Sequence, residues 1–169
     1  MHMLFGLSAM ENRLSPSGTR SFRFRQYPPD RLIYVMVAGL NYNNVWAASG
    51  KPEDVISRRR KNKGAESFHI GGSEASGIVC AIGNAVKKVK LGDAVVVSCS
   101  VYDSHSIEAH MSTDPMFCSS QEIYGYETNY GSFAEYTVVE DYQCYPKPAF
   151  LSWEESATLM LNGPPHTSN

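Results

Sequence analysis

The sequence predicts a mainly β fold with a few helices, in which the strands form a partly open barrel. Short runs of β-branched and aromatic residues are separated by glycine-containing turns, a pattern typical of such folds. A strong helix-start signal occurs only late in the chain. The predicted strands are residues 21–26, 32–38, 75–82, 94–98 and 131–140.

Each strand has its own signal. Residues 21–26 alternate Phe22 and Phe24 with arginines, and this two-residue period favours an edge strand. Residues 32–38 are continuously apolar and β-branched or aromatic, which indicates a buried strand. A Gly-Asp pair at 92–93 supplies the turn before the strand at 94–98.

The segments between the strands are less regular. The asparagines at 41–44 can cap a short helical turn over 45–48. Residues 50–66 are expected to form a charged loop, and residues 100–123 a long excursion without periodicity, which is usually functional or disordered. The capping box at 152–155 opens a helix that is predicted to run through Leu161.

Composition excludes several classes of protein. Apolar residues make up 43% of the chain and charged residues 19%, as in ordinary globular domains. The net charge of -2 predicts no attraction to nucleic acid or to an anionic membrane. The N-terminus is a poor signal peptide, so we expect a cytoplasmic protein. We expect a flexible segment at 1–20, one domain over 21–163 and a tail at 164–169.

The cysteines do not have the spacing of a metal site. The four are Cys80, Cys99, Cys118 and Cys144, and none form a CxxC pair. We therefore expect reduced, mostly buried thiols and no metal.

Several sequence blocks together resemble one family. The blocks are residues 38–47, 68–79, 114–117, 124–134, 146–148 and 151–155. In this order and spacing they are similar to the GroES-like catalytic domain of crotonyl-CoA carboxylase/reductases, zinc-free members of the medium-chain dehydrogenase/reductase superfamily. The resemblance implies a GroES-like β-barrel that is followed by an NADPH-binding Rossmann domain. It also implies reduction of α,β-unsaturated acyl-CoA thioesters, whose enolate can be trapped with CO2.

The resemblance also implies which groups this chain lacks. Asn41 stands where the zinc alcohol dehydrogenases have a cysteine, and Ser73 stands near their histidine, so we expect no zinc. No GxGxxG-type phosphate-binding turn follows a strand, and the sequence ends soon after residue 163. We therefore expect no Rossmann domain, no cofactor and no NADPH binding by the isolated chain.

Three candidate catalytic residues follow from the resemblance. Asn43 corresponds to an asparagine that helps to hold CO2, Tyr126 lies beside it, and Glu127 orients CO2 through water. Glu127 also lies among aromatic residues in the sequence, and if their rings exclude water they should raise the pKa of its carboxyl group toward that of a general acid or base. The alternatives are a glutamate that bonds to backbone and an asparagine that caps a helix. The candidate substrate-binding residues are Tyr42, Asn41, Trp46, Tyr130 and Phe133.

Three functions remain open at this point. The first is a non-redox biosynthetic enzyme, a cyclase, isomerase or lyase, acting on an acyl-thioester or polyketide-type substrate with Glu127 as acid or base. The second is a split or decayed enoyl reductase fragment that needs NADPH from another chain, and the third is a binding module. An apolar face without its cofactor domain predicts a homodimer or a covering partner. The basic run at 57–63 is either a solvated loop or a phosphate contact.

Overall fold

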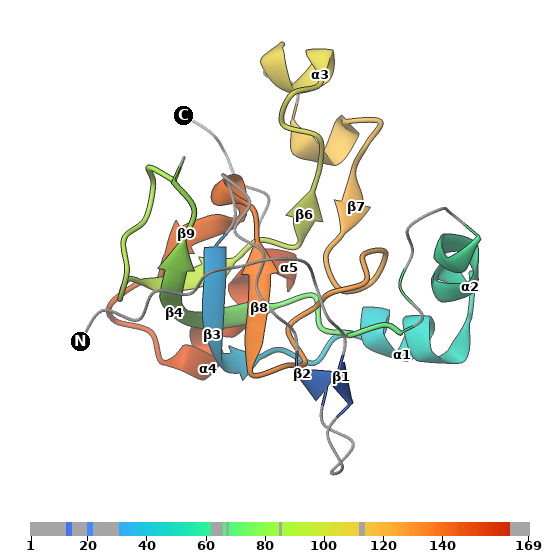
Figure 1. Ribbon diagram of the computed structural model, residues 1–169, viewed down its shortest axis with the longest axis horizontal. Coiled ribbons are helices and arrows are strands. Elements are labelled where there is room, and N and C mark those ends of the chain that lie inside the picture. The colour runs from blue at the N-terminus through green and yellow to red at the C-terminus, as the bar shows by residue number, and fades with distance from the viewer. Residues whose placement is uncertain are drawn as a thin grey trace.

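An antiparallel sheet forms the centre of the fold (Figure 1). The computed structural model describes residues 31–61, 66, 68–84, 86–111 and 114–162, together with the backbone of 13–14 and 20–21. The sheet has five strands in the order β8-β3-β4-β5-β9, and every neighbouring pair is antiparallel. The strands are β3 (Arg31–Ala38), β4 (Ala75–Ile82), β5 (Ala94–Val97), β8 (Tyr136–Val139) and β9 (Cys144–Pro146).

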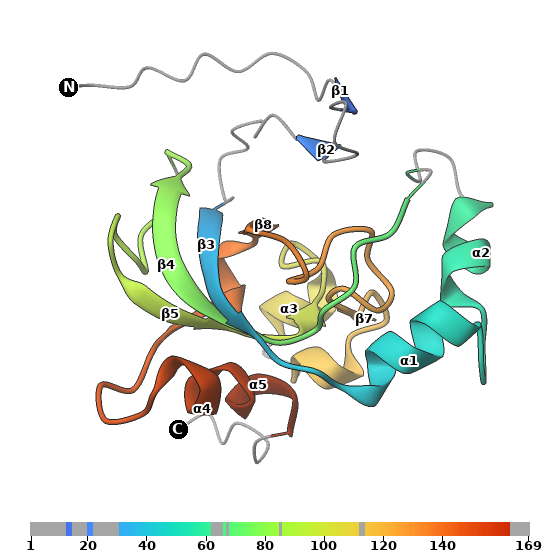
Figure 2. The same ribbon diagram turned by 90° about the horizontal axis from the view of Figure 1, so that it is seen from below.

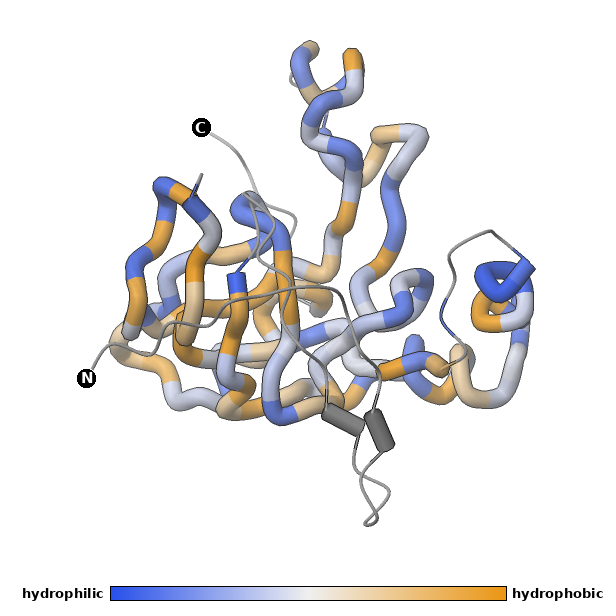
Figure 3. The backbone as a smooth tube through the Cα atoms, viewed as in Figure 1, coloured by the Kyte–Doolittle hydropathy of each residue, from blue (hydrophilic) through white to orange (hydrophobic). Residues whose placement is uncertain are grey.

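The sheet curves strongly but does not close, as Figure 2 shows for β3, β4 and β5. The prediction of a mainly β, partly open GroES-like barrel without a Rossmann domain is therefore confirmed for the described residues. Gly77 allows the close approach of β3 and β4, because a Cβ atom at this position would lie 2.4 Å from the carbonyl oxygen of Tyr34. The curved face encloses the main core, which consists of Ile33, Ala75, Val79, Val89, Val95, Val97, Tyr124, Val139 and Cys144. Figure 3 shows the same concentration of apolar residues along the strands.

Helices lie at two places around the sheet. α1 (Tyr42–Ser49) and α2 (Val55–Arg60) follow β3 and extend to one side, whereas α4 (Trp153–Ala157) and α5 (Leu159–Asn162) pack beneath the sheet (Figure 2). The capping box of Ser152 and Glu155 is present as predicted, with Ser152 Oγ accepting from Glu155 N at 3.1 Å. Ser76 Oγ donates to the carbonyl oxygen of Trp153 at 2.7 Å and thereby fastens α4 to β4.

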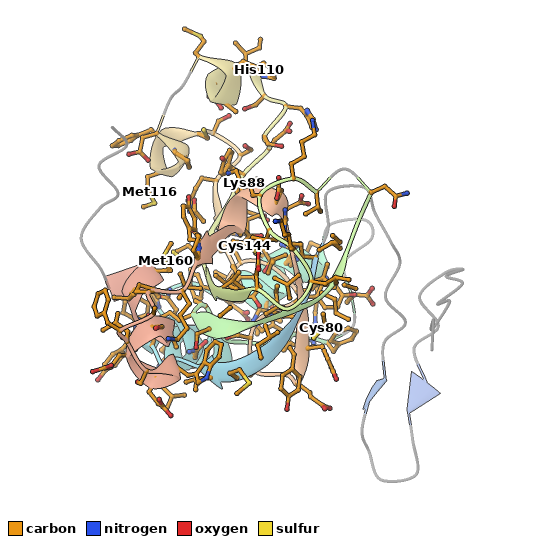
Figure 4. All side chains as sticks on the ribbon, turned by 90° about the vertical axis from the view of Figure 1, so that its left-hand side faces the viewer. Cys80, Lys88, His110, Met116, Cys144 and Met160 are labelled. Atoms are coloured by element: carbon orange, nitrogen blue, oxygen red, sulfur yellow. The ribbon has the colours of Figure 1, made fainter. Side chains whose placement is uncertain are left out.

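A two-stranded arm projects from the barrel (Figure 1). It contains β6 (Ser100–Val101), α3 (Ile107–His110), the 3-10 turn η1 (Pro115–Phe117) and β7 (Glu122–Ile123). Figure 4 places His110 and Met116 on this arm, well away from Cys144 in the sheet. Within its described residues, 100–111 and 114–123, the predicted excursion thus forms short elements. The remaining elements are β1 (Arg13–Leu14), β2 (Arg20–Ser21) and η2 (Asp141–Gln143).

Three sequence predictions differ from the structure. The segment 50–66 is not only a loop, because Asp54 accepts from Ser57 N at 2.9 Å and caps α2. The predicted strand 131–140 is paired only as β8, because the backbone at 132–133 bonds to the carbonyl oxygens at 71–72 instead. The predicted helix through Leu161 is divided into α4 and α5. The strand predicted at 21–26 lies almost wholly outside the described residues.

The cysteines are all free thiols. Cys118 and Cys144 are buried, Cys99 is half-buried and Cys80 is exposed, so burial is less general than predicted. Burial raises the pKa of the Cys144 thiol to about 11, which keeps it protonated and unreactive at neutral pH. Within the described residues, no helix has the length and apolarity needed to cross a membrane.

Candidate functional site

Asn41 links the start of α1 to the barrel. Its Oδ1 accepts from Asn43 N at 3.0 Å, and its Nδ2 donates to Glu74 Oε1 at 3.2 Å. The side chain is therefore an N-cap and a glutamate partner at once. The predicted substrate-binding role of Asn41 stays a prediction, but the structure gives this residue a clear structural role.

Glu74 is the most deeply buried acid of the site, and the sequence reasoning missed it. Its exposed fraction is 0%, and burial raises the pKa of its carboxyl group, an effect that the hydrogen bond from Asn41 opposes. Gly39 makes room for it, because a Cβ atom on Gly39 would lie 2.3 Å from Glu74 Oε2. The available sequence signal was an acidic residue immediately before a buried strand.

The segment 71–74 is joined to two distant parts of the chain. Gly72 N donates to Asn44 Oδ1 at 2.8 Å, which connects the segment to α1. Ser132 N and Phe133 N donate to the carbonyl oxygens of Gly72 and Gly71 at 3.0 and 2.9 Å. These bonds hold Phe133 beside the start of α1 while 43% of its surface stays exposed.

The exposed face of α1 is aromatic and apolar. Tyr42 is 71% exposed and Trp46 is 42% exposed, and their ring centroids are 6.1 Å apart. Leu40 and Val45 are exposed beside them in the sequence. Asn43, by contrast, is only 7% exposed. The helix thus presents a surface for an apolar group next to a mostly buried amide.

Glu127 is held by donors from two directions. Its Oε1 accepts from Arg58 Nη2 at 2.9 Å, and its Oε2 accepts from Ile123 N at 2.8 Å. The Arg59 guanidinium also contacts its carbonyl oxygen. The polar contacts of this carboxylate are a guanidinium and a backbone amide, and 21% of its side chain is exposed, so it is partly open to water. The backbone-bonded alternative was therefore correct for Oε2.

The two tyrosine candidates near Glu127 in the sequence, Tyr126 and Tyr130, have different surroundings. Tyr126 is half-buried, and burial followed by the charges of Glu127 and Glu53 raises the pKa of its hydroxyl group. The Tyr130 hydroxyl donates to Glu66 Oε1 at 3.1 Å, and burial and this acid raise its pKa to about 12. Tyr130 lines a cavity of about 380 Å³ toward β8 rather than the face of α1.

The structure therefore divides the predicted site into groups. Tyr126 and Glu127 lie on the turn held by α2, and Tyr130 faces the separate cavity. The other candidates lie around α1, namely Asn41, Tyr42, Asn43, Trp46 and Phe133. Among the described hydrogen bonds, none joins Asn43 directly to Glu127.

Two arginines of the basic run are paired with acids. Arg58 pairs with Glu53 at 2.7 Å as well as with Glu127, and Arg59 lies 3.4 Å from Glu122. The prediction of a loop is wrong for residues 57–60, which belong to α2, although most of them are exposed to solvent. The pairing also leaves less positive charge for a phosphate than the sequence implies.

The described residues do not fit the cofactor that the family implies. The central sheet is entirely antiparallel, so it has no βαβ unit with a glycine turn at a helix N-terminus. No step through NADPH is therefore assigned to this chain's residues. The same described part of the chain contains no cluster of three or more His, Cys, Asp or Glu side chains with the geometry of a metal site.

The curved, open antiparallel sheet described above fits the fold of a GroES-like domain. The family of the alcohol dehydrogenase GroES-like domain matches residues 28–149, and the chain belongs to this family. Within it, the chain is of the crotonyl-CoA carboxylase/reductase type of the medium-chain dehydrogenase/reductase superfamily, which confirms the resemblance.

Three relatives illustrate this similarity. The crotonyl-CoA carboxylase/reductase of Cereibacter sphaeroides is 44% identical over 130 residues, which cover 77% of this chain and 29% of the relative. The structure of crotonyl-CoA carboxylase/reductase AntE in complex with NADP is 46% identical, with a TM-score of 0.69 over 82% of this chain and 35% of that one. The 2-octenoyl-CoA carboxylase reductase CinF, in complex with NADP and 2-octenoyl-CoA, is 34% identical, with a TM-score of 0.72 over 82% and 33%. The chain thus spans about a third or less of the length of these relatives.

Proposed function

We propose that this chain is the acyl-thioester-binding domain for a reductive carboxylation of α,β-unsaturated acyl-CoA. The observation that carries the proposal is the placement of two residues: Asn43 lies in α1, and Glu127 lies on a turn that is held by α2, the helix after α1. The chain is also 46% identical, over 82% of its length, to a crotonyl-CoA carboxylase/reductase. Asn43 is mostly buried in the first turn of α1, and Glu127 is oriented by two donors.

Each residue has a distinct role in this proposal. The exposed rings of Tyr42 and Trp46 contact the acyl chain, and Phe133 borders the same face. The Asn43 amide donates to CO2, and Glu127 orients it through a water molecule, with Tyr126 beside them. The carboxylate of Glu127 retains acceptor capacity for that water, because two oxygens offer about four lone-pair sites and only one bond is made to each.

Hydride delivery lies outside the described residues. An NADPH-binding domain, in the same polypeptide or in another chain, supplies it in this proposal. Leu40, Tyr42 and Val45 leave an exposed apolar surface that such a domain, or a second copy of this chain, would cover.

A non-redox function is the second candidate. The Glu127 carboxylate is fixed in orientation yet partly open to water, and this combination also suits proton transfer in an isomerase, cyclase or lyase acting on an acyl-thioester or polyketide-type substrate. A pure binding module is the third candidate, and it would retain thioester affinity without turnover.

One experiment separates these candidates. Crotonyl-CoA and 2-octenoyl-CoA are titrated calorimetrically into the chain. Each is then incubated with the chain and labelled bicarbonate, with and without NADPH together with an added NADPH-binding domain. Label that enters the acyl-CoA only when NADPH and this domain are both present supports the main proposal. A product formed without NADPH supports the non-redox candidate, and binding without any product under all conditions supports the binding module. Absence of acyl-CoA binding would sink the proposal.

A further inference from the structure

Two consecutive arginines of α2 hold the turn that carries Glu127. Arg58 bonds to the carboxylate at 2.9 Å, and Arg59 contacts the carbonyl oxygen of the same residue. α2 follows α1 directly through Gly50, whose φ of 67° is the left-handed conformation of a helix C-cap. One pair of helices therefore both presents Asn43 and fixes Glu127.

Arg58 is shared between two acids. Its Nη1 donates to Glu53 at 2.7 Å, and its Nη2 donates to Glu127 at 2.9 Å. The arginine side chain is 52% exposed, so the pair with Glu127 lies at the surface of the site rather than in the core. Its charge can therefore act on a ligand that reaches Glu127, although water weakens the effect.

Carboxylation moves negative charge toward the pair of Arg58 and Glu127. When the enolate of an acyl thioester adds to CO2, a bond forms between its C2 atom and the carbon of CO2. The electron pair passes to an oxygen of CO2, so the charge leaves the enolate oxygen and appears on a new carboxylate. If Glu127 orients the CO2, that carboxylate forms near an existing one, and like charges disfavour each other unless a cation offsets them.

We propose that Arg58 is the positioning residue of this site: it holds Glu127 in place and offsets the negative charge of the new carboxylate. The inference rests on the proposed function, because it requires CO2 to be held at Glu127. Arg58 then favours the carboxylated product over the uncarboxylated one without touching the acyl chain.

The test compares two ligands that need no turnover. Butyryl-CoA and its 2-carboxylated derivative are titrated calorimetrically into the full chain and into variants at α2. We expect Arg58→Met to weaken binding of the carboxylated ligand by roughly three- to tenfold, as loss of one partly screened charge should. Binding of butyryl-CoA should change by less than about twofold, because this ligand has no charge at C2 that Arg58 could offset. Arg58→Lys should restore most of the preference because it keeps the charge.

Two further variants make the result specific. Lys61→Met removes the same charge from the exposed C-cap of α2 and should leave the ratio of affinities unchanged. Glu53→Gln removes the competing acid and should raise the preference for the carboxylated ligand. A purely structural role for Arg58 predicts equal loss for both ligands and no gain in the Glu53→Gln protein.

The outcomes for the inference and for the proposed function can be told apart. If the parent binds both ligands and Arg58→Met leaves their ratio unchanged, the inference is overturned while the acyl-CoA site stands. If the parent binds neither, the proposed function fails and the inference fails with it. If Arg58→Met does not fold, Glu53→Gln decides, since an unchanged ratio there also overturns the inference.

Discussion

Replacement of Glu127 by glutamine tests two contributions of its carboxylate, one to the stability of the turn and one to the reaction rate. Glutamine has nearly the same shape, but its amide has one acceptor oxygen where the carboxylate has two. Both observed contacts, Arg58 Nη2 and Ile123 N, are donors. The variant can therefore satisfy only one of them and must turn its NH2 group toward the other.

The expected loss follows from these two contacts. A hydrogen bond from a backbone amide to a charged group contributes about 1.5–3 kcal/mol, and an exposed ion pair contributes at most about 1 kcal/mol. Because glutamine keeps one acceptor and the site is partly open to water, we expect Glu127→Gln to lower the free energy of unfolding by about 1–2 kcal/mol. If Glu127 transfers a proton, the reaction rate should also fall by roughly 10²–10⁴-fold.

Urea unfolding measures the first quantity, and turnover of an unsaturated acyl-CoA measures the second. The matched control is Glu122→Gln, which removes an acid of the preceding strand β7 that lies 3.4 Å from Arg59 and is 45% exposed. It should cost under about 1 kcal/mol and leave the rate unchanged. A Glu127→Gln protein with the parent's unfolding midpoint and the parent's rate would refute both the structural and the catalytic reasoning.

Three other predictions concern the buried acid Glu74, the glycine at 125 and the exposed face of α1. Burial raises the pKa of the Glu74 carboxyl group, so its contribution to stability is complete below the ordinary pKa of 4.5 and is lost as the pH rises toward the pKa in the folded protein. Denaturant melts of the parent across this pH range should show a decline of at most about 1.4 kcal/mol per pH unit, and Glu74→Gln should remove it. Gly125→Ala should lower stability by more than about 3 kcal/mol, since φ is 66° and a Cβ atom would lie 2.0 Å from the Gly72 carbonyl oxygen. The control Gly92→Ala has φ of 85° but no atom within 4 Å of the new Cβ, so it should cost only about 1–2 kcal/mol, and equal thermal midpoints for the two variants would contradict this account. Trp46→Ala should weaken binding of 2-octenoyl-CoA roughly tenfold more than that of crotonyl-CoA, because each buried CH2 group contributes up to about 0.8 kcal/mol; equal losses in calorimetry would remove Trp46 from the acyl site.

The sheet could be predicted where its signals are local. β4 has the predicted bounds, and β3 and β5 differ by one residue at an end, because each is a run of apolar residues bounded by polar or glycine turns. The capping box before α4 was also visible, since its two side chains lie three residues apart. Such features depend on neighbours along the chain and need no knowledge of distant segments.

The failures arise where distant contacts decide the local conformation. α2 is six residues long, too short for a helical period to show, and the burial of Val55 at 2% depends on tertiary packing. Residues 132–133 have a strand-like sequence, but their amides bond to the carbonyl oxygens of Gly71 and Gly72. No pattern within either segment indicates which carbonyl groups will lie opposite.

The environment of Glu127 shows the same limit for a site residue. Aromatic residues surround it in the sequence, yet its charged partner Arg58 comes from 69 positions away. The motif was therefore enough to propose Glu127 as a functional residue but not to predict its electrostatic surroundings. Two fixed donors, Arg58 Nη2 and Ile123 N, set the direction in which this carboxylate points. A fixed direction is what the proposed role of Glu127 in orienting CO2 through water requires, and it comes from segments that the motif itself does not contain.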